Sequence, residues 1–134
     1  MTGRLANNFT DLEVYQRAKG LASTVFERTR SFPREETYAL TDQLRRSSRA
    51  IGAQIAEAWG KRQYPRHFLS KLTDADAEQL ELQHWIAVAV DCGHLEPETA
   101  ADLLEELGII GRMLGSMMEK ARLFRRETGP CVDR

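Results

Sequence analysis

Apolar side chains recur along this chain at intervals of three and four residues, the spacing that places them on one face of an α-helix. The pattern predicts four helices, over about residues 10–32, 35–62, 65–92 and 97–124. No stretch shows the sustained alternation of apolar and polar residues that is typical of a β-strand. Four long helices with short connections favour an all-α fold, an antiparallel up-and-down four-helix bundle.

Residues at the ends of these segments support the boundaries. Thr10 followed by Glu13 has the capping-box pattern of a helix start. Pro65 and Pro97 each suit the first turn of a helix, where a missing backbone N–H costs nothing. Gly93 suits the position just after a helix, because glycine adopts the left-handed conformation without strain.

The length of 134 residues fits a single domain over 1–134, with an ordered core over about 9–126 and tails at 1–8 and 127–134. No apolar run approaches the roughly 18 residues of a membrane span, and the N-terminus lacks the apolar region of a secretory signal. Two cysteines, Cys92 and Cys131, suggest neither a disulfide framework nor a zinc spacing. We therefore expect a cytoplasmic protein without a membrane segment.

Charge is distributed very unevenly along the chain, although the net charge is only −1. Residues 43–71 hold seven basic and one acidic side chain, whereas residues 72–111 hold ten acidic side chains and no Lys or Arg. Such segregation indicates either a surface for nucleic acid or charge pairing within and between subunits.

The basic segment supplies a candidate nucleic-acid surface. Arg45 and Arg49 lie four residues apart on one helical face, and Tyr64 and His67 add aromatic rings on which bases could stack. The candidate phosphate-binding residues are Arg45, Arg46, Arg49, Lys61, Arg62 and Arg66. The competing interpretation, which the isoelectric point near 6.3 favours, is that these cations pair with acids of the next helix.

Two further sets of residues suggest contacts between helices or subunits. Three glycines of the 97–124 segment, Gly108, Gly111 and Gly115, are spaced by three and four residues and so share one helical face. Each glycine inside a helix costs about 0.5–1 kcal/mol relative to alanine, so the three imply a close approach within the fold or between subunits. The candidate oligomer contacts are these glycines and the acids of the 65–92 segment: Gly108, Gly111, Gly115, Asp74, Glu78 and Glu81.

Catalytic patterns are weak. Glu81 and His84 form a Glu-x-x-His pair of the kind that holds di-iron centres, but such a centre needs a second pair and two more carboxylates. Ser47 and Ser48 have no histidine and acid partners in their sequence context. We therefore expect no enzyme, no metal and no cofactor, with a di-iron enzyme as the least favoured hypothesis.

Several segments, in order and spacing, are similar to a known family. These are Phe9–Ala18, Gln43–Arg46, Ile51–Arg62 and Asp91–Leu95, and the similarity covers about residues 9–125. The chain resembles the four-helix-bundle proteins linked to intervening sequences of 23S ribosomal RNA genes. Gln54 and Ala58 depart from the residues usual in that family, Asn and Gly.

The resemblance also implies partners. The family is related to the accessory variability proteins of diversity-generating retroelements, which form ring-like homopentamers, bind nucleic acid and associate with a reverse transcriptase. Our leading hypothesis is a non-enzymatic, self-associating binding or scaffold module, a homopentamer by resemblance. The alternative is an RNA- or DNA-binding accessory protein that acts with a reverse transcriptase or another nucleic-acid enzyme through the basic segment.

Overall fold

The computed structural model describes residues 6–121 and 124, and this part of the chain is helical without a strand. The four long helices are α1 (Glu13–Thr29), α2 (Asp42–Gly60), α3 (Pro65–Asp91) and α4 (Pro97–Glu119). Three short helices complete the order: η1 (Phe9–Asp11) before α1, and η2 (Arg34–Glu36) and η3 (Thr37–Thr41) before α2. The predictions of an all-α fold and of four long helices are confirmed. The expected C-terminal tail, 127–134, lies outside the described residues.

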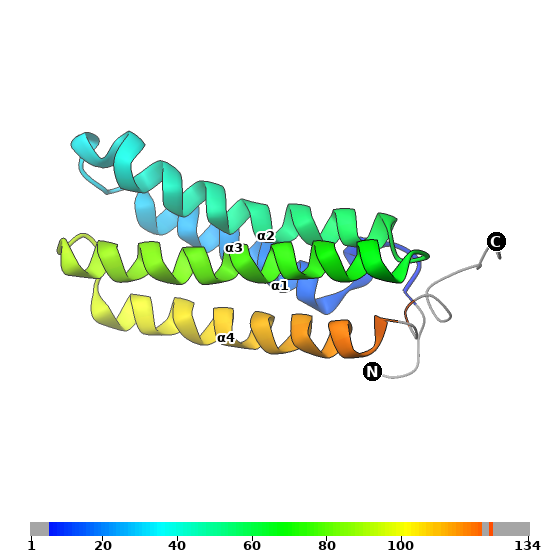
Figure 1. The fold of residues 1–134 in the computed structure, drawn as a ribbon. Helices are drawn as coiled ribbons and strands as arrows, with labels where there is room; N and C mark the ends of the chain where they lie inside the picture. Colours follow the sequence, from blue (N-terminus) through cyan, green and yellow to red (C-terminus); the bar gives the residue numbers. More distant parts are fainter. Residues whose placement is uncertain (1–5, 122–123, 125–134) are drawn as a thin grey trace.

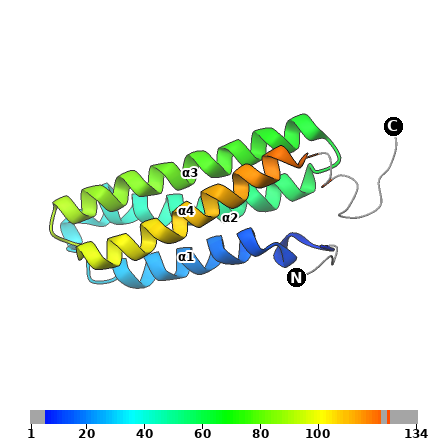
Figure 2. The ribbon, with the colours of Figure 1, turned by 90° about the horizontal axis from the view of Figure 1, so that it is seen from below.

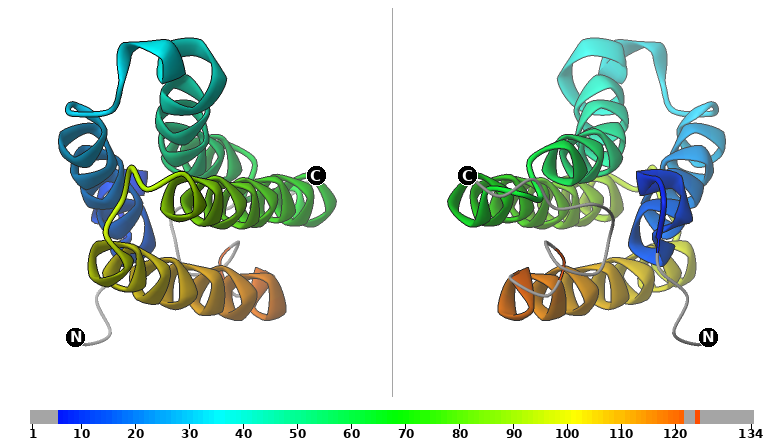
Figure 3. Two further views of the ribbon diagram at one scale, coloured as in Figure 1. Left: turned by 90° about the vertical axis from the view of Figure 1, so that its left-hand side faces the viewer. Right: turned by 90° about the vertical axis from the view of Figure 1, so that its right-hand side faces the viewer.

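The long helices lie lengthwise beside one another, and short turns join them at their ends (Figures 1 and 2). α2 makes its most extensive contacts with α3, while α1 packs against both α2 and α4. Figure 3 shows the four long helices from both ends, and their buried apolar side chains form one core. From α1, Val25 is among the largest fully buried apolar side chains of this core. The others come from α2, α3 and α4 and are Leu44, Ile51, Ile55, Phe68, Leu72, Leu82, Ile86, Leu107, Ile110 and Leu114.

The predicted capping box at Thr10 and Glu13 is wrong. Asn8 is the capping residue instead: its Oδ1 accepts from the Thr10 N–H at 3.1 Å, and Asp11 Oδ2 accepts from the Asn8 N–H at 3.2 Å. This box starts η1, and α1 begins at Glu13 after an extended Leu12. Asparagine is at least as good an N-cap as threonine. The capping box therefore forms between Asn8 and Asp11 and not between Thr10 and Glu13.

The predicted helix over 35–62 is divided at its start. Residues of η2 have 3₁₀ geometry and those of η3 have π geometry, with the Asp42 N–H donating to the Thr37 carbonyl. The wider π turn changes which side chains face the core. Leu40 is therefore buried, whereas Tyr38 is 84% exposed.

The boundaries marked by Pro65, Gly93 and Pro97 agree with the sequence prediction, whereas α1 ends at Thr29 and α4 at Glu119, before the predicted ends at 32 and 124. Pro65 and Pro97 occupy first turns, and α3 ends before Gly93, whose φ of +79° lies in the left-handed region. The N–H groups of Gly93 and His94 donate to the carbonyls of Val90 and Ala89, both at 2.9 Å. These two bonds form a Schellman motif, which satisfies the carbonyls at the end of α3. Within the described residues, no helix has the length and apolar character of a membrane span.

Candidate functional site

The six candidate phosphate-binding residues divide into groups with different surroundings. Arg46 pairs with α3: its Nη2 lies 2.7 Å from Glu81 Oε2, which also accepts from Trp85 Nε1 at 3.0 Å. Glu81 is thus engaged by two side chains of the same chain. A phosphate would have to compete with this carboxylate for Arg46.

Arg45 and Arg49 surround an aromatic ring of α1. Arg45 donates from Nε to Thr29 Oγ1 at 2.8 Å, and its guanidinium carbon lies 4.5 Å from the centre of the Phe26 ring. Arg49 lies 5.8 Å from the same ring and is exposed. Cation–π contacts of this kind hold an arginine against a neighbouring helix. Arg45 therefore joins α1 to α2, whereas Arg49 keeps its charge at the surface.

The remaining cations lie around the turn between α2 and α3. Arg62 stacks on Trp59 at 4.0 Å and donates to the Trp59 carbonyl at 2.9 Å, and burial lowers its pKa. Lys61 and Arg66 are exposed, and neither forms an ion pair within the described residues. Tyr64 is exposed beside them. Of the six candidates, Lys61 and Arg66 are exposed and have neither an ion pair nor a cation–π contact within the described residues.

The acids of α3 have distinct roles. Lys71 bridges two helices: its Nζ lies 2.6 Å from Glu57 Oε1 of α2 and 3.8 Å from Asp74 Oδ2 of α3. The hydrogen bond from Lys71 to Glu57 raises the pKa of the ammonium group. Glu78 is half-buried, and burial, reinforced by the negative charge of Glu81, raises its pKa.

A shallow groove runs along the outer face of α1 and α2. Two adjoining hollows of about 370 and 320 Å³ share Lys19, Ala22 and Arg49. Phe26 lies at one end and Tyr15 at the other. We call this the α1/α2 groove; the small residues along it are Ala18, Ala22, Ser23, Ser48, Gly52, Ala53 and Ala56. Small side chains leave room for a helix to approach closely.

The three glycines of α4 have unequal neighbours. A Cβ at Gly111 would lie 3.1 Å from Gln79 Nε2, so α3 and α4 approach closely there. Among the described residues, a Cβ at Gly115 would have nothing within 4 Å, and one at Gly108 would meet only Arg112 of the same helix. Of these three glycines, Gly111 alone serves a close contact with another helix in the part of the chain that the structure describes.

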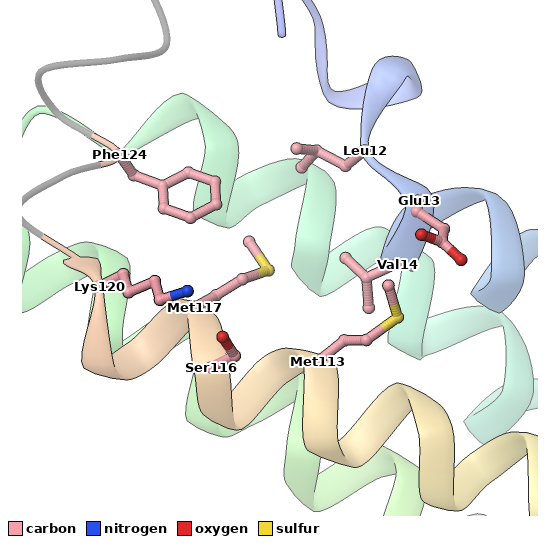
Figure 4. A pocket seen from close by; sticks show the side chains of 8 residues that line it. All are labelled: Leu12, Glu13, Val14, Met113, Ser116, Met117, Lys120 and Phe124. Atoms are coloured by element: carbon pink, nitrogen blue, oxygen red, sulfur yellow. The ribbon is translucent and has the colours of Figure 1, made fainter. Parts of the chain in front are cut away.

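Sulfur-containing side chains of α4 line an apolar pocket beside α1. Figure 4 shows Met113 and Met117 extending from α4 toward Val14, with Leu12 and Phe124 at the rim. The pocket has a volume of about 300 Å³. Methionine suits irregular spaces of this kind.

The Glu-x-x-His pair does not form a metal centre with other ligands in the described part of the chain. Glu81 is engaged by Arg46 and Trp85, and His84 is exposed beside Trp85. A different group, Glu36, Cys92 and His94, brings potential metal ligands together. Sequence analysis missed it because Glu36 is far from the other two along the chain.

Comparisons with known proteins agree with the fold. The crystal structure of a protein of unknown function from the S23 ribosomal protein family of Bacteroides thetaiotaomicron is similar, with a TM-score of 0.71 and 22% identity. The similarity covers 79% of this chain and 95% of that one. No curated protein matches the chain. The family model described as 23S rRNA-intervening sequence protein matches residues 10–116, well over half of the sequence, and the chain belongs to this family.

Proposed function

We propose that this protein is a non-enzymatic scaffold, an antiparallel up-and-down four-helix bundle that associates with further copies of itself. The observation that carries the proposal is the α1/α2 groove, which small residues line and in which Lys19 and Arg49 outnumber the one acid, Glu27, itself paired with Arg30 at 3.6 Å. A groove of this kind can accept a helix. Acidic side chains on the face that enters the groove would lie opposite its basic residues.

The chain itself offers such a helix. Glu98, Asp102 and Glu105 of α4 are spaced by four and three residues, so they share one face, and all three are exposed. Within the described residues none of them forms an ion pair. The negative face of α4 therefore complements the positive groove of another copy, and opposite charges steer the two surfaces together.

When two copies associate through two different surfaces, one copy keeps its acidic face free and the other keeps its groove free. Contacts of this head-to-tail type continue from copy to copy until they close a ring or extend as a filament. The family resemblance supports a closed ring, a homopentamer. A ring would display several copies of each surface, and repeated weak sites gain avidity without new contacts.

Blocking the groove should weaken association. Ala53→Trp places a large ring at an exposed groove position, where it cannot disturb the core. We expect the dissociation constant between copies to rise at least about tenfold, which corresponds to about 1.4 kcal/mol. Light scattering coupled to size-exclusion chromatography over a dilution series measures it.

Ala87→Trp is the matched control, because Ala87 is an exposed alanine of α3 outside the groove. This variant should associate like the wild type. Equal association of both variants would exclude the groove as the interface, and a wild-type monomer at micromolar concentration would contradict the scaffold proposal itself.

A second function is favoured by the turn between α2 and α3. Exposed Lys61 and Arg66, with neither in an ion pair of the described residues, lie beside Tyr64, which is 53% exposed. Cations for phosphates and an aromatic ring for base stacking are the elements of a single-stranded nucleic-acid surface. Under this alternative, the protein binds RNA or DNA as an accessory to a reverse transcriptase or another nucleic-acid enzyme.

Charge reversal at this turn tests the alternative. The double variant Lys61→Glu and Arg66→Glu should bind a fluorescent single-stranded oligonucleotide at least about tenfold more weakly, with a smaller dependence on salt. Arg46→Glu serves as the comparison, because Arg46 is already occupied by Glu81. Wild-type affinity that is unaffected by salt, or by the double variant, would contradict the alternative.

A further inference from the structure

Three metal-ligating side chains meet at the end of the molecule opposite the turn between α2 and α3. His94 Nε2 lies 2.9 Å from Glu36 Oε2, and the ligand atoms of Glu36, Cys92 and His94 all lie within 4.8 Å of one another. The first residue belongs to η2 and the other two to the connection between α3 and α4. Both connections lie on the left of Figure 1, and the left panel of Figure 3 looks onto them.

The backbone holds this arrangement in place. Cys92 is the C-cap of α3 and His94 follows Gly93 in the Schellman motif, so two backbone hydrogen bonds fix the residues that carry the thiol and the imidazole. Phe32 packs against the His94 ring at 5.5 Å between centroids. The side chains of His94 and Glu36 are only 17% and 20% exposed, so both are restricted before any ligand binds.

We propose that Glu36, Cys92 and His94 form a binding site for a thiophilic divalent cation, with Zn²⁺ as the best match. Zn²⁺ takes thiolate, imidazole and carboxylate ligands together, whereas Mg²⁺ and Ca²⁺ prefer oxygen alone. With Zn–ligand bonds of about 2.0–2.3 Å, tetrahedral ligand atoms lie about 3.3–3.6 Å apart. Cys92 is exposed, so rotation of its side chain can close the remaining separation.

Such an ion would have a structural consequence. The three ligands come from two connections that are distant in sequence, so the ion would fasten the start of the α2 segment to the turn between α3 and α4. Water would complete the coordination, since three protein ligands leave a fourth position open. Because the ion binds the folded chain, the melting temperature should rise with Zn²⁺ concentration.

Titration of the metal-free, reduced full-length protein with Zn²⁺ tests the site. Calorimetry should show one ion per chain, and Co²⁺ in its place should give the charge-transfer absorption of a thiolate ligand. Cys92→Ser and His94→Gln should each lower the affinity at least about tenfold, because even partners outside the coordination shell contribute about 10–100-fold. Both variants should retain the helical circular dichroism of the wild type.

Two matched controls separate this site from other metal binding. Cys131→Ser removes the other thiol, which lies outside the described residues, and His84→Gln removes an exposed imidazole of α3. Both variants should bind Zn²⁺ and Co²⁺ like the wild type. The proposal is overturned if the wild type binds no Zn²⁺, or if Cys92→Ser binds as tightly as the wild type.

Discussion

Phe68→Ala should lower the free energy of unfolding by about 3–5 kcal/mol, the cost of removing an aromatic side chain from a packed interior. Phe68 is 1% exposed in the first turns of α3, and its ring lies 5.4 Å from that of Phe124. Truncation leaves a cavity where the start of α3 meets the end of α4. Chemical denaturation followed by circular dichroism measures the loss.

Leu80→Ala is the control for this prediction. Leu80 is a large apolar residue of the same helix but is 55% exposed, so its truncation should change stability by no more than about 0.5 kcal/mol. Both variants should be compared at one protein concentration, since self-association would add to apparent stability. Equal losses for the two variants would mean that Phe68 is not part of the core.

The helices could be predicted because their signals are local. Pro65, Pro97 and Gly93 act through their own backbone, and each stands where its chemistry requires. The start of α1 was predicted wrongly because Asn8 and Thr10 are both good capping residues. The π turn of η3 has no comparable signal, since its residues are compatible with an ordinary α-helix.

The surroundings of the candidate residues were less predictable, because they depend on side chains that are distant in sequence. Arg46 and Glu81 were both recognised, but only the packing of α2 on α3 makes them a pair. Arg45 lies against Phe26 of α1, a partner that the charge pattern does not reveal. Glu36 and His94 meet only because the chain runs out along α2, turns back once and returns along the whole of α3.

Two glycine-to-alanine substitutions should have opposite effects. Gly93→Ala should lower the free energy of unfolding by about 1–2 kcal/mol, because its φ of +79° is costly for a residue with a Cβ. Gly115→Ala should raise it by about 0.5–1 kcal/mol, because Gly115 lies within α4 and a Cβ there has no described residue within 4 Å. Denaturation of both variants should therefore separate them by about 1.5–3 kcal/mol.

The same pair of variants also distinguishes a fold contact from a contact between copies. Gly115 is a candidate oligomer contact, and a Cβ there would meet none of the described residues within 4 Å. Gly115→Ala should therefore stabilise each copy, and a simultaneous loss of association in light scattering would place Gly115 at the interface. Gly93→Ala should leave association unchanged, since Gly93 ends α3 beside Cys92 and His94, away from the α1/α2 groove. Stabilisation by Gly93→Ala would contradict the left-handed turn on which the position of those two side chains depends.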